Sequence, residues 1–154
     1  MDIVIPIRTV PDPVEELDPD PDGTDIDREW TEFVINEFDD HAIEEAVLLK
    51  ERRDGEDSIT VVALDDGLAD VEQMLYTAAA KGVDRLVRIV DVPPGISTHG
   101  AASLFGSVLA EMSFDAVFTG VQSSEDRDGQ LAGMLGNDLD IPHLSVITEV
   151  VADD

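Results

Sequence analysis

Residues 58–90 read SITVVALDDGLADVEQMLYTAAAKGVDRLVRIV, and this stretch decides the fold class. The apolar, β-branched run at residues 58–64 predicts a buried strand. Residues 69–80 have helical spacing, and Gly82 suits the position just past a helix C-terminus. A second strand is predicted at residues 85–90. Strand, helix and strand in this order form the repeating unit of a parallel sheet, so the stretch predicts an α/β fold.

The same alternation of strands and helices extends to both sides of this unit. Residues 10–32 interrupt it with an acidic, proline-rich surface excursion, and Trp30, Phe33 and Ile35 then alternate as a short strand or an anchored return to the core. Asp39 or Asp40 is the predicted N-cap of the helix that follows. Further strands are predicted at residues 3–7, 114–119 and 144–150, and further helices at residues 39–53, 98–112 and 129–139. We therefore expect one α/β domain over residues 1–154, with an acidic surface loop at about residues 11–29, built on a doubly wound, mainly parallel sheet with helices on both faces.

Composition limits the classes of function. The chain has 154 residues, 36 acidic against 9 basic side chains, a formal charge of −27 and no cysteine. The scarcity of lysine and the spread of acids along the chain favour a protein adapted to molar salt, while an acidic face for a basic partner is the alternative. Without a basic patch, nucleic-acid binding is not expected. No signal peptide or membrane-spanning run is visible, so we expect a cytoplasmic protein without membrane insertion.

Motifs for metal binding and catalysis are weak. Residues 18–29 fit the D-x-D-x-D-G-x5-E calcium-loop pattern, but prolines interrupt it and a solvated loop is the favoured interpretation. His41, His99 and His143 share no ligand spacing. Ser123 and its neighbour have no base at a recognisable offset. We therefore expect neither a metal site nor a catalytic residue.

The loop after the fourth predicted strand is the best candidate for a ligand site. Ligands of doubly wound sheets bind outside the carboxyl ends of the strands, which here are followed by loops after Ile7, Leu64, Val90 and Thr119. The last of these, residues 119–130, reads TGVQSSEDRDGQ and leads directly into a predicted helix. Free backbone N–H groups at such a helix start favour a phosphate.

Four segments together resemble the electron-transfer flavoprotein beta subunit. They are the opening IVIPIRTVPD at residues 3–12, the helix entry INEFDDHAIEEA at residues 35–46, the turn AAAKGVDR at residues 78–85 and the loop GVQS…GQ at residues 120–130. The match follows the family's order and spacing over nearly the whole chain. It implies an adenine-nucleotide-binding, Rossmann-like domain that holds AMP, or FAD in bifurcating members.

The resemblance also implies the residues that contact the nucleotide. Pro6 and Leu64 would lie along the adenosine, residues 36–39 at the rim, and residues 120–122 and 127–131 around the phosphate. Arg8 is added as a ligand or subunit contact at the end of the first strand. The complete set is Pro6, Arg8, Asn36, Glu37, Phe38, Asp39, Leu64, Gly120, Val121, Gln122, Ser123, Arg127, Asp128, Gly129, Gln130 and Leu131.

Several positions depart from the family pattern. Val121 replaces a lysine, Glu37 replaces a proline, and Arg127-Asp128 stands where Asp-Thr is common. Arg127 could supply the positive charge that Val121 lacks, because a guanidinium binds phosphate bidentately. These changes leave AMP, FAD and an empty pocket as open alternatives. The family's further C-terminal segment and arm have no counterpart in the sequence.

The resemblance implies an electron carrier rather than an enzyme that transforms a substrate. Its partner would be a FAD-carrying alpha subunit, and the complex would take electrons from acyl-CoA or other dehydrogenases towards the respiratory chain. The alternative is a stand-alone adenine-nucleotide-binding or stress-sensor module of the same superfamily, although its G-x2-G-x9-G spacing is poorly matched here. A pyrophosphatase-like enzyme would require an S-G-G-x-D-S loop after the first strand, and residues 9–12 read TVPD instead.

Overall fold

The computed structural model describes residues 1–53 and 56–152, so residues 54–55 and 153–154 of the predicted domain lie outside it. Strands β1 (Asp2–Ile7), β4 (Ser58–Leu64), β5 (Arg85–Ile89) and β6 (Ala116–Val117) form one parallel sheet in the order β5-β4-β1-β6. The chain runs from β1 through β4 to β5 and then crosses to β6 on the other side of β1. The doubly wound α/β prediction is confirmed, and the strand order reverses between β1 and β6.

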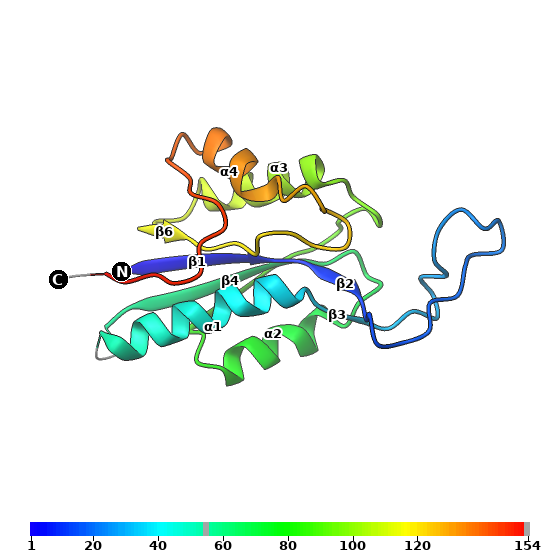
Figure 1. Ribbon diagram of the computed structural model, residues 1–154, viewed down its shortest axis with the longest axis horizontal. Helices are drawn as coiled ribbons and strands as arrows, with labels where there is room; N and C mark the ends of the chain where they lie inside the picture. The colour runs from blue at the N-terminus through cyan, green and yellow to red at the C-terminus, as the bar shows by residue number, and fades with distance from the viewer. Residues whose placement is uncertain (54–55, 153–154) are drawn as a thin grey trace.

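Two helices cover each face of this sheet (Figure 1). Helices α1 (Glu37–Arg52) and α2 (Val71–Ala80) lie on one face, and α3 (Thr98–Leu109) and α4 (Leu131–Asp138) lie on the other. Side chains alternate along a strand, so Ile3, Ile5 and Ile7 of β1 pack with α1 and α2 while Val4 packs with α3 and α4. The sheet is therefore buried on both sides, which explains its nearly continuous apolar strands.

The start of α1 differs from the prediction. Asn36 is the N-cap residue, and the helix begins at Glu37. Asp39 is fully buried inside the first turn, so the prediction that Asp39 or Asp40 caps the helix was wrong. The acids at residues 39 and 40 do mark the start of a helix. The carboxylate of Asp39, however, points towards the end of β1 rather than towards the N–H groups of its own helix.

The predicted last strand, residues 144–150, was also wrong. This segment has no regular secondary structure, and Leu144 and Val146 are 81% and 77% exposed. Val146 has φ +59°, a left-handed conformation that a β-branched residue rarely adopts and that does not occur within a strand. The preceding strand β6 is shorter than predicted, because only two residues pair with β1. An apolar run forms a strand only where a neighbouring strand accepts it.

The acidic excursion forms a projecting ribbon. Strands β2 (Thr9–Pro11) and β3 (Phe33–Ile35) pair antiparallel and hold its base. We call residues 12–32 the acidic ribbon, and Figure 1 shows it extending away from the sheet and helices. Its two sides are joined by backbone hydrogen bonds from Asp12 N to Glu32 O, 2.9 Å, and from Asp27 N to Asp18 O, 2.8 Å. Trp30 is 81% exposed and does not return to the core. No helix within the described residues is long and apolar enough to cross a membrane.

Candidate functional site

Arg8 lies at the point where the strand order reverses. It directly follows β1, and its guanidinium extends towards the loop between β6 and α4. Nη1 donates to Oδ2 of Asp126 at 3.2 Å, and Nη2 donates to the carbonyl oxygen of Gln122 at 3.3 Å. The side chain is only 11% exposed. A buried guanidinium therefore joins the end of β1 to the loop that was predicted to hold a phosphate.

Asp39 anchors the other side of this guanidinium. Its two carboxylate oxygens accept hydrogen bonds from the backbone N–H of Arg8 at 2.8 Å, from Nε and Nη2 of Arg8 at 3.3 Å each, and from the backbone N–H of Gly120 at 3.0 Å. Burial raises the pKa of the Asp39 carboxyl, while the positive charge and hydrogen bonds of Arg8 oppose that rise. The first turn of α1, the end of β1 and the start of the 120–130 loop are thereby held together through one side chain.

Gly120 is required by this close approach. A Cβ at Gly120 would lie 2.7 Å from the backbone nitrogen of Asp39 and 2.8 Å from the carbonyl carbon of Phe38. Such distances leave no room for a side chain against the backbone of α1. Asn36 adds a further contact, because its Nδ2 donates to the carbonyl oxygen of Gln122 at 2.9 Å. The loop is thus fixed to the start of α1 by the N-cap residue Asn36 and by Asp39 in the first turn.

Asp126 occupies the N-terminal end of α4. Its carboxylate oxygens accept hydrogen bonds from the backbone N–H groups of Gln130 at 3.1 Å and of Leu131 at 3.3 Å. The side chain is 5% exposed and also pairs with Arg8. Ser123 fixes the backbone at this position, because its hydroxyl oxygen accepts a hydrogen bond from the N–H of Asp126 at 3.0 Å. The backbone donors that favour an anion at a helix start are therefore engaged by a side chain of the same loop.

Gly129 is required by the backbone geometry of the loop. Its φ of +62° lies in the left-handed region, and an added Cβ would collide with the carbonyl oxygen of Val121. The resemblance to the flavoprotein family placed this glycine among the residues around the phosphate. The loop geometry alone already requires it, because the backbone of residue 129 turns against that of residue 121.

A small cavity lies between this cluster and the ends of the neighbouring strands. Its volume is about 50 Å³, and Arg8, Leu64, Ser123 and Asp126 line it together with Arg28 from the acidic ribbon. Arg28 donates from Nη2 to Glu125 at 3.2 Å, which ties the ribbon to the 120–130 loop. The ribbon therefore contributes one wall of the cavity although it projects from the domain.

The structure brings part of the predicted set together and leaves part of it apart. Pro6 is buried in β1 opposite Val62 of β4, and Leu64 ends that neighbouring strand. Those residues that meet in the cluster described above are Arg8, Asn36, Asp39, Gly120, Gln122, Ser123, Gln130 and Leu131.

Other members of the set point away from the cluster. Glu37 is exposed, and the ring of Phe38 packs edge-on against His41 with centroids 6.1 Å apart. Val121 is 38% exposed. Arg127 and Asp128 are both exposed, and no ion pair of Arg127 is found within the described part of the chain. The cation that pairs with the Asp126 carboxylate at the start of α4 is Arg8.

Sequence reasoning missed Asp126, Arg28 and Phe33, which all line the cavity. For Asp126 a signal was present. A carboxylate four and five residues before the first N–H groups of a helix, with a serine three residues earlier, matches a loop that folds back on the helix start. In a chain with 36 acids this signal does not separate Asp126 from its neighbours Glu125 and Asp128.

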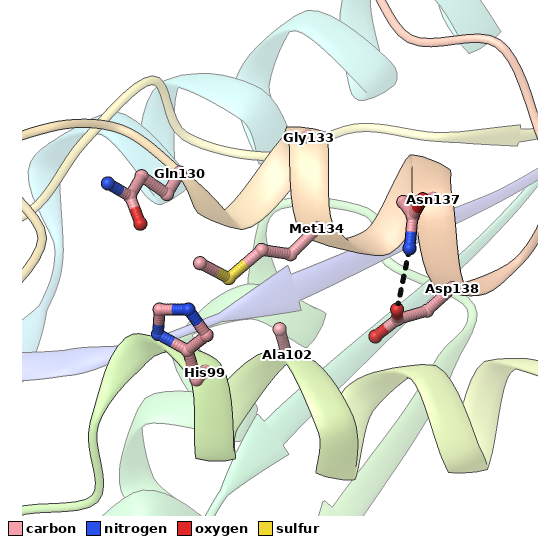
Figure 2. A pocket seen from close by; sticks show the side chains of 7 residues that line it. All are labelled: His99, Ala102, Gln130, Gly133, Met134, Asn137 and Asp138. Atoms are coloured by element: carbon pink, nitrogen blue, oxygen red, sulfur yellow. Dashed lines mark hydrogen bonds between the residues drawn. The ribbon is translucent and has the colours of Figure 1, made fainter.

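A larger hollow of about 510 Å³ runs along α3 and α4, from His99 and Gln130 at their N-terminal ends to Asp138 (Figure 2). Its lining includes Met134, and the dashed line in Figure 2 marks the hydrogen bond from Asn137 Nδ2 to Asp138 Oδ1, 3.3 Å. Within the described part of the chain, no arginine or lysine lines this groove. On chemical grounds the smaller cavity at the strand ends is the candidate site.

The fold and the charged cluster at its reversal point define a doubly wound α/β domain with a carboxyl-edge site. Comparison with known proteins places it in a family. The sequence model of one protein family, the electron transfer flavoprotein domain, matches residues 25–154, so the chain belongs to that family.

Among its relatives are proteins called electron transfer flavoprotein subunit beta. The protein from Methylophilus methylotrophus is 29% identical over 151 residues, which cover 97% of this chain and 56% of the relative. That from Bacillus subtilis is 32% identical over 127 residues, or 81% of this chain and 48% of the relative. The human protein is 28% identical over 152 residues, or 96% of this chain and 58% of the relative. The chain thus spans about half the length of the curated relatives it matches.

Proposed function

We propose that this chain is the nucleotide-holding domain of an electron transfer flavoprotein beta subunit. In this function it binds an adenine nucleotide, AMP or FAD, at the carboxyl edge of the sheet and pairs with a FAD-carrying alpha subunit. The complex then carries electrons from acyl-CoA or other dehydrogenases towards the respiratory chain, in the cytoplasm. The domain itself makes and breaks no substrate bond.

The observation that supports the proposal is the buried Arg8 guanidinium at the reversal point between β1 and β6. Doubly wound sheets bind nucleotides at this point, and a guanidinium together with helix-start N–H groups suits a phosphate. Leu64 gives the cavity an apolar wall. The membership in the flavoprotein family and the similarity to beta subunits point to the same ligand class.

The chemistry of the donors fits a nucleotide, but the space and the charge do not fit one in this conformation. The cavity of about 50 Å³ is well below the roughly 300 Å³ at the lower end of small-molecule sites. The carboxylate of Asp126 also engages the N–H groups of Gln130 and Leu131. Binding a nucleotide therefore requires the 120–130 loop to open.

The test is to purify the protein from its own cells in molar salt, denature it and identify the released nucleotides by mass spectrometry. AMP or FAD, with an alpha subunit in the same purified complex, would support the proposal and decide between the two nucleotides. ATP in a homodimer would favour the stand-alone module. A complex without any nucleotide would contradict the nucleotide-holding function and leave the family membership intact.

A further inference from the structure

The carboxylate of Asp126 makes the contacts that an anionic ligand would make at this edge of the sheet. Its oxygens receive the N–H groups of Gln130 and Leu131 and the Nη1 of Arg8, all at 3.1–3.3 Å. With 5% of the side chain exposed, water does not reach it freely. Three donors from α4 and β1 thus converge on one buried negative group that belongs to the protein itself.

The charges in the cluster are unequal. One guanidinium, that of Arg8, faces two carboxylates, those of Asp39 and Asp126. Asp39 is held by backbone N–H groups of Arg8 and Gly120 and is part of the packed interior. The backbone of Asp126 makes only local hydrogen bonds, to Ser123 and Gly129, while the loop around it is tied to α1 through Gly120 and Gln122. Of the two carboxylates, Asp126 is the one that can leave without unpacking the core.

A phosphate cannot join this cluster while Asp126 remains in it. Its negative charges would lie beside two carboxylates that share the Arg8 guanidinium, in a poorly hydrated site where like charges repel strongly, and the other cation of the cavity wall, Arg28, is already paired with Asp25 and Glu125. The small volume of the cavity also excludes a phosphate in this conformation. Departure of the Asp126 carboxylate eases both restrictions, because it frees three donors and takes one charged side chain out of the cavity wall.

We propose that Asp126 is a specificity-determining residue that competes with the phosphate of the ligand for Arg8 and the N-terminal end of α4. This inference rests on the proposed nucleotide site and names how that site is regulated. The native chain then gains little affinity from a ligand phosphate, and it discriminates weakly between adenosine and AMP. Removing the negative charge of residue 126 restores the advantage of the phosphate.

The test compares the wild-type protein with Asp126→Asn, which keeps the size of the side chain. Adenosine, AMP and inorganic phosphate are titrated in molar KCl by calorimetry, and the amide NMR signals of Gln130 and Leu131 are followed in parallel. We expect AMP to bind at least about tenfold more tightly to Asp126→Asn, adenosine to change by less than about twofold, and phosphate to shift both amide signals. Glu111→Gln, an exposed charge removal at the far end of α3, should behave as the wild type.

The inference fails alone if AMP binds both proteins with equal affinity, or more weakly to Asp126→Asn. The proposed function and the inference fail together if folded wild type and folded variant bind neither AMP nor adenosine. Asp126→Ser provides a second, smaller neutral side chain for the same comparison, and circular dichroism establishes that each variant is folded. Equal AMP affinity in both neutral variants and the wild type would overturn the role of Asp126.

Discussion

The two ends of the sheet each bury a carboxylate beside positive charge, but in opposite proportions. At the carboxyl end, the single guanidinium of Arg8 faces Asp39 and Asp126. At the amino end, Asp57 contacts two cations, with Oδ1 2.7 Å from the Met1 amine and Oδ2 3.1 Å from Nε of Arg53. Among the described residues, two carboxylates therefore contact one guanidinium at the carboxyl end, and two cations contact one carboxylate at the amino end.

The pKa directions follow this difference. Burial raises the pKa of Asp39, and Arg8 only partly opposes it. Burial also acts to raise the pKa of Asp57, but hydrogen bonds from the Met1 amine and Arg53 outweigh it and lower that pKa below its usual value. The amino end is therefore an ion cluster whose cations favour the charged form of Asp57 and so stabilise the fold. The carboxyl end keeps a carboxylate that a ligand anion can replace.

Removing the anchor of the carboxyl end should have the largest effect. Asp39→Ala leaves the Arg8 guanidinium buried without its main partner and the N–H of Gly120 without an acceptor. We expect a loss of about 3–5 kcal/mol in the free energy of unfolding, measured by urea denaturation in molar salt. Glu44→Gln, an exposed charge removal on the same helix, is the control and should change it by less than about 0.5 kcal/mol. Equal losses in the two variants would remove Asp39 from its anchoring role.

Gly120→Ala tests the close approach of the loop to α1. The new Cβ would meet backbone atoms of Asp39 and Phe38 rather than flexible side chains, so we expect a loss of about 1–3 kcal/mol. Gly106→Ala in α3 is the matched control, because its Cβ would find neighbours no closer than 3.8 Å. There a gain of about 0.5–1 kcal/mol is expected from helix propensity. Thermal unfolding of the pair measures both, and effects of the same sign would contradict the packing argument.

Asp57→Asn tests the amino end, and we expect a smaller loss of stability than for Asp39→Ala. The sign of its pH dependence follows from the lowered pKa. A carboxyl with a lowered pKa stabilises the folded protein above its unfolded pKa of about 3.9, and this contribution is lost as the pH falls through the folded pKa. The difference between wild type and Asp57→Asn should therefore be constant near neutral pH and shrink in acid. Denaturant midpoints measured over a pH series would show it, and a difference that grows in acid would refute it.

The smallest effect is expected at the link between the acidic ribbon and the site. Arg28→Gln removes ion pairs to Asp25 and Glu125, both of whose side chains are largely exposed. Stability should change by less than about 1 kcal/mol, because exposed pairs contribute little in high salt. Amide hydrogen exchange across residues 12–32 should nevertheless become faster. Unchanged exchange there would show that Arg28 does not hold the ribbon.

The fold could be predicted from the sequence where burial decides the structure. Strands β1 and β4 are apolar on both faces, and the helices α1 and α2 carry apolar stripes, so their order and type follow from pattern alone. The segment at residues 144–150 has the same apolar character, but no neighbouring strand accepts it. Whether a segment pairs as a strand depends on its neighbours in the fold and cannot be predicted from the segment alone.

The structure brings together Arg8 and the loop at residues 120–130, which the sequence offered as candidates because Arg8 ends the first strand and the loop is polar, rich in glycine and followed by a helix. That these residues bind a ligand stays a prediction. The inward orientation of the Asp126 side chain could not be predicted from the sequence. The loop has three acids within residues 125–128, and only the position of α4 decides which of them accepts from the N–H groups at its start. Asp39 was misread as a cap for a similar reason, since its partner Arg8 is 31 residues away in the chain.

The hydrogen bond between Asp12 and Glu32 at the base of the acidic ribbon has a consequence for the chain's tolerance of insertions. Because the two ends of the ribbon are already in contact, its length enters the folding free energy only through the entropy of closing a loop. That entropy changes slowly, by about 0.6 kcal/mol for each doubling of the loop. The ribbon can therefore lengthen or shorten at little thermodynamic cost, provided that Arg28 keeps its place in the cavity wall and its pair with Glu125.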